Sequence, residues 1–224
     1  MHFNTDKRIA VVFGATGLVG NYLVQELIND ESYSFIDVFV RKSTGNNHVK
    51  VREYIIDFSR LEERANLING NDLFICLGTT IRKAGSVKRV EEIDRDLPVR
   101  LAQIAFSNGV KKVAVVSSMG ANPYSRHYYM RIKGEMESGI LKIPFDQTVI
   151  ARPSMLFGRR NEFRFGENVG KMVMKTIGFL LIGSIRKYRG IHDQTVAAAM
   201  IELLRSPQSK IVYLSDELQK FGKK

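Results

Sequence analysis

Residues 11–20 read VVFGATGLVG, with glycines at positions 14, 17 and 20 directly after a run of apolar β-forming residues. In a strand–turn–helix unit, the first glycine of such a pattern permits a tight turn, the second lets a phosphate approach the backbone and the third lets the helix pack close to the strand. The amides at the start of the helix then face a pyrophosphate, which the helix dipole also favours. We predict that Gly14, Gly17 and Gly20 bind a dinucleotide; the alternative is a turn whose glycines serve packing alone.

The rest of the chain alternates between strand-like runs and helical segments. Apolar runs predict strands at Arg8 to Phe13, Phe35 to Val40, Glu53 to Ile56, Leu73 to Leu77, Val113 to Ser117 and Thr148 to Ala151. This alternation is typical of crossover units and a parallel sheet with helices on both faces. The predicted fold class is therefore α/β: a doubly wound, Rossmann-like parallel sheet with a small C-terminal cap segment.

Several helix ends can also be located in the sequence. Ser59 and Glu62 have capping-box spacing ahead of a helix, and Asn108-Gly109 supplies a stop for the helix before it. The pattern becomes irregular over residues 159–190, which we predict to be a substrate-side insertion over the sheet edge. A helix from about Asp193 to Leu204 is expected to follow it.

Length and composition predict a soluble globular protein with one domain over residues 1–224. The single cysteine, Cys76, lies in an apolar run where we expect burial, and a chain with one cysteine suits a reducing compartment. The N-terminus lacks a secretory signal, and the longest apolar stretch, residues 176–185, is shorter than the roughly 20 residues that cross a bilayer. We therefore predict a cytoplasmic protein without a membrane span.

The net charge is +11, which favours an anionic ligand over a neutral one. No nucleic-acid-binding module stands out, so we expect a basic surface and no dedicated nucleic-acid site. The four histidines are scattered without the spacing of metal ligands, so no metal site is predicted.

Cofactor preference depends on the end of the second predicted strand. An acidic residue there accepts a hydrogen bond from the adenosine ribose, whereas arginine accommodates a 2′-phosphate. The sequence at 36–43 is IDVFVRKS, which places Arg41 and Lys42 at that end and Asp37, the rival acidic candidate, earlier in the run. Because two cations suit a dianionic phosphate, we predict NADP(H) over NAD(H); a pair of solvated basic residues is the alternative.

Later strand ends supply further cofactor candidates. Asp57 follows the third predicted strand and is placed to meet the adenine amino group. Leu77, Gly78 and Thr79 follow the fourth strand, where the cofactor ribose is expected to lie against bare backbone.

Candidate catalytic residues follow the fifth predicted strand. Tyr129 and Lys133 are four residues apart, so both project from one face of a helix. A lysine ammonium beside a phenol stabilises the phenolate that general acid–base chemistry uses, and the same lysine can bind the nicotinamide ribose. Ser117 and Ser118 end the strand before this helix; Ser118 is a catalytic candidate, either serine could orient a substrate carbonyl, and both could instead satisfy strand-end amides.

These residues belong to segments that resemble a known family. The segments are GATGLVG, CLGTTIRKAG, DRDLPVRLA, SSMGA, YYMRIKGEME and ARPSMLFGRR. Together they are similar to the atypical short-chain dehydrogenase/reductases, in particular the branch of the HIV Tat-interactive-protein oxidoreductase. The resemblance covers nearly the whole chain and implies a Rossmann-like fold that binds NADPH. The implied cofactor contacts are Thr16, Gly17, Leu18, Val19, Arg41, Lys42, Leu77, Gly78, Tyr129, Lys133, Leu156 and Arg164.

Three functions are consistent with this sequence. The first is an NADPH-dependent reductase that acts on the carbonyl of a small-molecule substrate. The second is an NADPH-binding sensor that presents its basic surface to a protein partner. The third is an epimerase-like enzyme for nucleoside-diphosphate sugars, although little chain remains for a sugar pocket. A homodimer is compatible with all three.

Overall fold

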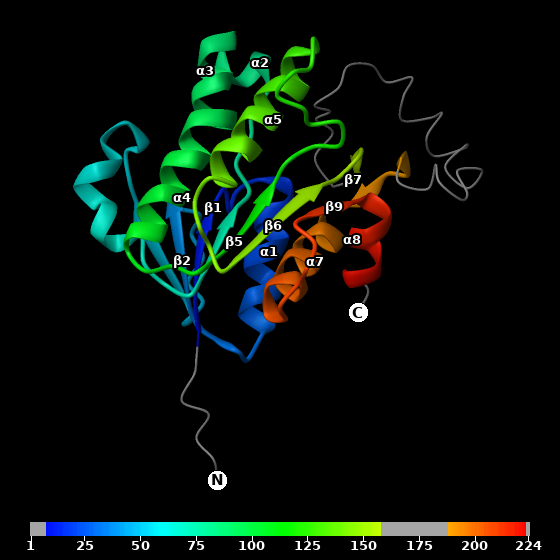
Figure 1. Cartoon of the computed structure of the whole chain (residues 1–224). Coiled ribbons are helices and arrows are strands. Elements are labelled where there is room, and N and C mark those ends of the chain that lie inside the picture. Colours follow the sequence, from blue (N-terminus) through cyan, green and yellow to red (C-terminus); the bar gives the residue numbers. More distant parts are fainter. Residues whose placement is uncertain (1–7, 158–187, 223–224) are drawn as a thin grey trace.

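The computed structural model describes residues 8–157 and 188–222, and its centre is a seven-stranded sheet (Figure 1). The strand order is β3-β2-β1-β4-β5-β6-β9, and every neighbouring pair is parallel. The strands are β1 Arg8–Phe13, β2 Tyr33–Val40, β3 Val51–Ile55, β4 Asp72–Ile75, β5 Lys112–Val116, β6 Gln147–Arg152 and β9 Val212–Leu214. This order confirms the predicted doubly wound, Rossmann-like sheet.

Helices cover both faces of the sheet, as Figure 1 shows. One face carries α1 (Leu18–Asn29), α7 (Asp193–Arg205) and α8 (Ser215–Phe221). The other face carries the 3₁₀ helix η1 (Phe58–Leu67), α4 (Leu97–Ser107) and α5 (Tyr128–Ile140). Because residues alternate across a strand, Ala10 and Val12 pack on the first face and Val11 and Phe13 on the second. All four are fully buried, which explains why this strand reads as a continuous apolar run.

Shorter elements complete the described structure. They are α2 (Ile81–Ala84), α3 (Val87–Glu91) and the π-helical turn η2 (Glu92–Asp96), which leads directly into α4. A separate two-stranded sheet pairs β7 (Leu156–Phe157) with β8 (Ile191–His192). In the described ranges, no helix has both the length and the apolar character that a membrane crossing requires.

The turn between β1 and α1 has no room for side chains at Gly14 and Gly20. Gly14 has φ +85°, and a Cβ placed on it would lie 2.6 Å from the carbonyl of Cys76 at the end of β4. A Cβ on Gly20 would lie 2.1 Å from the carbonyl oxygen of Gly14, because α1 packs directly onto the turn. The Gly17 amide donates to that same oxygen at 2.9 Å and closes the turn. Gly14 and Gly20 therefore have the steric roles predicted for them, whereas the phosphate-binding role of Gly17 stays a prediction.

The structure confirms most of the predicted elements and corrects others. The six predicted strands are present, but the three-residue strand β9 escaped prediction. The predicted capping box at Ser59 and Glu62 is wrong, because Asp57 caps η1 by accepting from the Ser59 amide at 2.9 Å. The stop at Asn108-Gly109 and the helix from Asp193 are confirmed. The predicted insertion at 159–190 lies mostly outside the described residues.

Gly20→Ala should destabilise the fold, because Gly20 is buried where α1 packs onto the turn. The new methyl group meets the Gly14 carbonyl, so either α1 or the turn must shift, at a cost of about 1–3 kcal/mol in the free energy of unfolding. Asn29→Ala, at the exposed end of the same helix, is the control and should change this free energy by less than about 0.5 kcal/mol. Urea denaturation measures both; equal midpoints for the two variants would contradict the steric role of Gly20.

Candidate functional site

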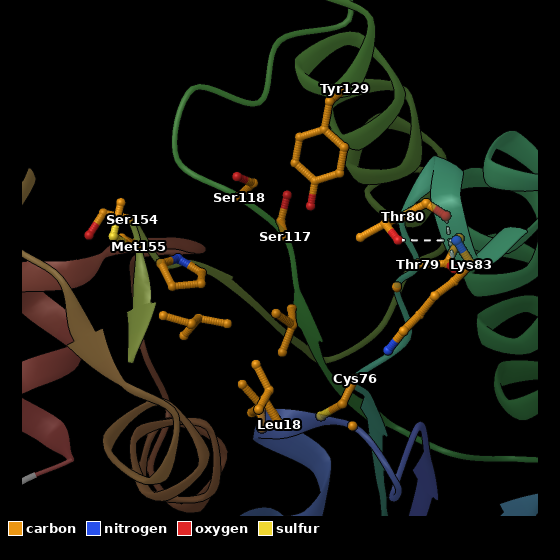
Figure 2. Close-up of a pocket in the computed structure, with 16 residues that line it drawn as sticks. Leu18, Cys76, Thr79, Thr80, Lys83, Ser117, Ser118, Tyr129, Ser154 and Met155 are labelled. Carbon is orange, nitrogen blue, oxygen red and sulfur yellow. Dashed lines mark hydrogen bonds between the residues drawn. The ribbon is translucent and has the colours of Figure 1, made fainter. Parts of the chain in front are cut away.

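A cavity lies at the carboxyl edge of the sheet, where the strand order reverses between β1 and β4. Parallel sheets of this type bind ligands at that point. Figure 2 shows Leu18 and Cys76 on one side of the cavity, Tyr129 opposite them, and Thr80 and Ser154 on its flanks. Its volume is about 150 Å³. The lining residues are Gly17, Leu18, Val19, Cys76, Gly78, Thr79, Thr80, Lys83, Val116, Ser117, Ser118, Tyr129, Pro153, Ser154, Met155 and Leu156.

The first turn of α1 presents unused amides to this cavity. Gly17 is the N-cap residue, so it offers no side chain to accept from those amides. No acidic residue occupies the first turn. The amides and the positive end of the helix dipole are therefore available to an anion. The steric limits at Gly14 and Gly20 keep the backbone bare at the same place, so the turn fits a pyrophosphate.

Tyr129 and the two strand-end serines lie together, but the serines have different surroundings. The Tyr129 ring extends from α5 toward Ser117 and Ser118 (Figure 2). The Ser117 hydroxyl donates to the buried Glu137 carboxylate, which Arg152 also binds. The Ser118 hydroxyl has only a long contact, 3.4 Å, to the carbonyl of Met119. Ser117 therefore has a structural partner, whereas Ser118 can turn toward a ligand.

Lys133 lies one turn along α5 from Tyr129, but it is fully buried and is not among the residues that line the cavity. It forms an ion pair that the sequence reasoning missed. Its ammonium lies 2.8 Å from Asp94 Oδ1, and neither side chain is exposed. The pair is at hydrogen-bonding distance, and the ammonium, which has three donors, has no second partner among the described residues. The second Asp94 oxygen accepts from the Thr79 amide at 2.8 Å. Asp94 thus connects the catalytic candidate Lys133 to the loop that follows β4.

The π-helical turn η2 explains why the sequence concealed Asp94. In the motif DRDLPVRLA, Asp94 stands in a charged run that resembles the solvated face of a helix. The wider turn inserts an extra residue into the helical repeat, a feature frequent at functional sites. A regular helical period therefore predicts that Asp94 faces solvent, whereas the structure buries it.

Lys83 is a second residue that the sequence reasoning missed. It is the only charged residue among the described residues that line the cavity. Its side chain extends from α2 into the cavity toward Cys76 (Figure 2). Lys83 belongs to the segment CLGTTIRKAG, but the sequence does not show the direction of its side chain. That direction follows from its place on the four-residue helix α2.

The adenosine end of the predicted site lies beyond β2. Arg41 and Lys42 are exposed directly after this strand, and neither forms an ion pair with any residue in the described ranges. Asp37, the rival acidic candidate, is buried within β2, where Arg52 of β3 donates to it at 2.5 and 2.8 Å. Burial raises the pKa of Asp37, and the hydrogen bonds from Arg52 oppose that rise. Both oxygens of the Asp37 carboxylate therefore bind Arg52 within the sheet.

The remaining predicted residues are distributed around these features. Thr16 lines a second cavity, of about 510 Å³, between α1 and the loop after β2. Asp57 is exposed after β3, with one oxygen bound to Ser59. Leu77 packs against the core, and Leu156 lines the first cavity from β7. Arg164 lies outside the described residues. Within the described ranges, no group of three or more His, Cys, Asp or Glu residues is arranged to hold a metal ion.

Asp94→Asn should destabilise the protein strongly, because it leaves the buried Lys133 ammonium without a countercharge. The loss is expected to be about 3–5 kcal/mol in the free energy of unfolding. Lys133→Met in the same chain should restore most of the loss, since it removes the stranded charge. Glu62→Gln, which breaks the exposed pair with Arg100, is the control and should leave the denaturation midpoint unchanged. A single Asp94→Asn variant as stable as the wild type would contradict this account.

Comparisons with known proteins agree with the geometry. The NAD(P)H-binding family matches residues 14–207. Protein HTATIP2 of Rattus norvegicus is 32% identical over 211 residues, which cover 92% of this chain and 85% of the rat protein. The mitochondrial protein FMP52 of Candida albicans is 35% identical over 173 residues, which cover 75% of this chain and 74% of the fungal protein.

Solved structures support the fold. MoeE5 in complex with UDP-glucuronic acid and NAD has a TM-score of 0.67 at 16% identity, covering 91% of this chain and 74% of MoeE5. The UDP-N-acetylglucosamine 4-epimerase of Methanobrevibacter ruminantium has a TM-score of 0.65 at 17% identity, covering 96% of this chain and 80% of the epimerase. At these identities the likeness concerns architecture alone. Together with the family match and the closer relatives, it shows that the chain belongs to the NAD(P)H-binding family and is an atypical short-chain dehydrogenase/reductase resembling HTATIP2.

Proposed function

We propose that this chain is an NADPH-dependent oxidoreductase that reduces the carbonyl group of a small-molecule substrate, acting as one domain over residues 1–224. The observation that carries the proposal is the meeting of two features at one cavity. The uncapped N-terminus of α1 supplies amides for a pyrophosphate, and Tyr129 with Ser118 supplies hydroxyl groups for a carbonyl. Substrate contacts are expected from residues 159–190, which we propose as the substrate-side segment.

We assign residues along the sheet edge to successive parts of the cofactor. The bare glycine turn, with Thr16, Leu18 and Val19, would hold the pyrophosphate, and the Lys83 ammonium would add a positive charge there. The nicotinamide ribose would lie near Gly78, Thr79 and Lys133, whose ammonium retains unused donors. Leu156 and Arg164 are proposed at the nicotinamide end, and Leu77 and Asp57 beside the adenosine half.

When bound, NADPH supplies the hydride for the reduction. Tyr129 donates a proton from its hydroxyl to the carbonyl oxygen, while the Ser118 hydroxyl donates a hydrogen bond that orients the same oxygen. Lys133, one turn along α5 from Tyr129, would hold the nicotinamide ribose through its ammonium. Asp94 keeps the ammonium in place, because the buried ion pair fixes the lysine side chain.

The preference for NADPH rests on the two cations after β2. Arg41 and Lys42 have no ion-pair partner among the described residues, so their charges are available to a 2′-phosphate. The acidic residue that would favour NAD, Asp37, is bound by Arg52 inside the sheet. A ribose hydroxyl would therefore find no free carboxylate on β2.

For location, we propose the cytoplasm, which suits a chain with one buried cysteine. The names of the fungal FMP52 relatives include the word mitochondrial, so the mitochondrion is the competing location.

Tyr129→Phe should abolish turnover and leave cofactor binding intact. Removing a positioned proton donor is expected to lower kcat about 10²–10⁴-fold on a carbonyl substrate found by panel screening. Tyr128→Phe is a matched control, since the neighbouring hydroxyl donates to the Val87 carbonyl at 2.8 Å instead. An unchanged kcat in Tyr129→Phe would remove this residue from the mechanism. If no carbonyl compound oxidises NADPH, yet NADPH alters the affinity for a protein partner, the sensor function is the better account.

Arg41→Ala and Lys83→Ala should weaken coenzyme binding in different ways. Only NADPH carries the 2′-phosphate, so Arg41→Ala should weaken NADPH about 10- to 100-fold and leave NADH unchanged. Both coenzymes carry the pyrophosphate, so Lys83→Ala should weaken both by similar factors. Calorimetric titration of each variant with each coenzyme measures this. Equal affinity of the wild type for NADH and NADPH would show that the two cations do not recognise a 2′-phosphate.

A further inference from the structure

We propose that Glu53 is a positioning residue that sets the preference for NADPH over NADH, because it holds the loop after β2 in the shape that presents Arg41 and Lys42. This inference rests on the proposed function and adds a residue that neither the glycine turn nor the two cations identify. Among the described residues, the hydrogen-bond partners of Glu53 are Ser43 and Thr44, which are not proposed cofactor contacts. Its effect is transmitted through Ser43 and Thr44.

The carboxylate of Glu53 accepts hydrogen bonds from Ser43 and Thr44, which follow the two cations in the loop after β2. It accepts from the Ser43 hydroxyl at 2.7 Å, from the Thr44 amide at 3.0 and 3.2 Å, and from the Thr44 hydroxyl. The two hydroxyl oxygens in turn accept from the amides of Gly45 and Asn46, at 3.1 and 3.2 Å. One carboxylate thus orders four consecutive residues of the loop.

The strand register places this carboxylate on the same side of the sheet as α1. Glu53 pairs with Val38 in the parallel ladder, so the two side chains share a face. Val38 lines the cavity of about 510 Å³, together with Thr16 of the glycine turn and residues 44–47 of the loop. The loop therefore forms one wall of this cavity and the start of α1 forms another. Within residues 8–157 and 188–222, β3 is the edge strand, so no further strand of that part of the chain supports the loop from outside.

The position of the cations follows from the position of this loop. Arg41 and Lys42 are exposed and lie between the end of β2 and the first residue that Glu53 holds. β2 fixes them on one side and the Glu53 contacts fix them on the other. Loss of those contacts releases residues 43–46 from β3, and the two cations before them then pay a larger ordering entropy to meet a phosphate.

The charge of Glu53 allows a positioning role to be distinguished from direct electrostatic repulsion of the phosphate. Burial raises the pKa of this carboxyl, but the hydrogen bonds from Thr44 and Ser43 outweigh it and hold the pKa below its usual value. Glu53 is therefore an anion at neutral pH. An anion near the 2′-phosphate site repels a phosphate, so a purely electrostatic effect predicts that neutralising Glu53 strengthens NADPH binding. A positioning role predicts the opposite.

The test is calorimetric titration of Glu53→Gln with NADPH and with NADH. Glutamine keeps the shape of the side chain, but it has one acceptor oxygen and its amide group donates, so it cannot serve three donors. The ratio of NADPH to NADH affinity should fall roughly tenfold, through NADPH alone. Thr44→Val, which keeps the carboxylate and removes one hydroxyl, should lower the ratio in the same direction by a smaller factor. Glu62→Gln, at the exposed pair with Arg100, should leave the ratio unchanged.

The outcomes separate this inference from the function on which it rests. A wild type that prefers NADPH, with an unchanged or higher ratio in a folded Glu53→Gln variant, would overturn the role of Glu53 alone. Folding is checked by the thermal unfolding midpoint, and if Glu53→Gln does not fold, Thr44→Val decides by the same ratio. A wild type that binds both coenzymes equally would overturn the 2′-phosphate assignment together with this inference. A wild type that binds neither would overturn the proposed function as a whole.

Discussion

The structure depends on the close approach of two strand ends, β1 and β4. The Cys76 amide donates to the Phe13 carbonyl at 2.8 Å, and Gly14, the residue after β1, turns against the Cys76 carbonyl with a positive φ. A side chain at Gly14 would separate the two strands at the point where the strand order reverses. Because the turn stays bare, α1 begins with free amides directed at the sheet edge, and every proposed cofactor contact is arranged relative to them.

A second constraint concerns buried charge. Lys133 is fully buried, which is costly for an ammonium unless a countercharge accompanies it. Asp94 supplies that charge from the π-helical turn and also accepts from the Thr79 amide in the loop after β4. The catalytic candidate on α5 and the cofactor loop are therefore connected through a single carboxylate. Glu137 has a similar role one helical turn farther along α5, where it binds Ser117 and Arg152.

The sequence predicted those parts of the fold that depend on local or fully buried patterns. Strand β1 could be predicted because helices cover both of its faces, and the glycine turn because Gly14 and Gly20 leave no space for a side chain. The short strand β9 was missed because Val212–Leu214 is too brief for a recognisable pattern. The cap of η1 was misassigned because Asp57 and Ser59 both favour N-caps, and only backbone geometry distinguishes them.

The candidate site was predictable in part, for similar reasons. Tyr129, Ser118 and the residues of the turn lie where strand ends meet, so topology alone brings them together. Asp94, Lys83 and Glu53 act through the shape of η2, α2 and the loop after β2, and such shapes are not encoded in a simple period.

The most direct test of the central claim is an experimental structure of the chain with NADPH. The account predicts pyrophosphate oxygens within hydrogen-bond distance of the amides at the start of α1 and the nicotinamide beside Tyr129; a pyrophosphate bound away from the glycine turn would contradict it.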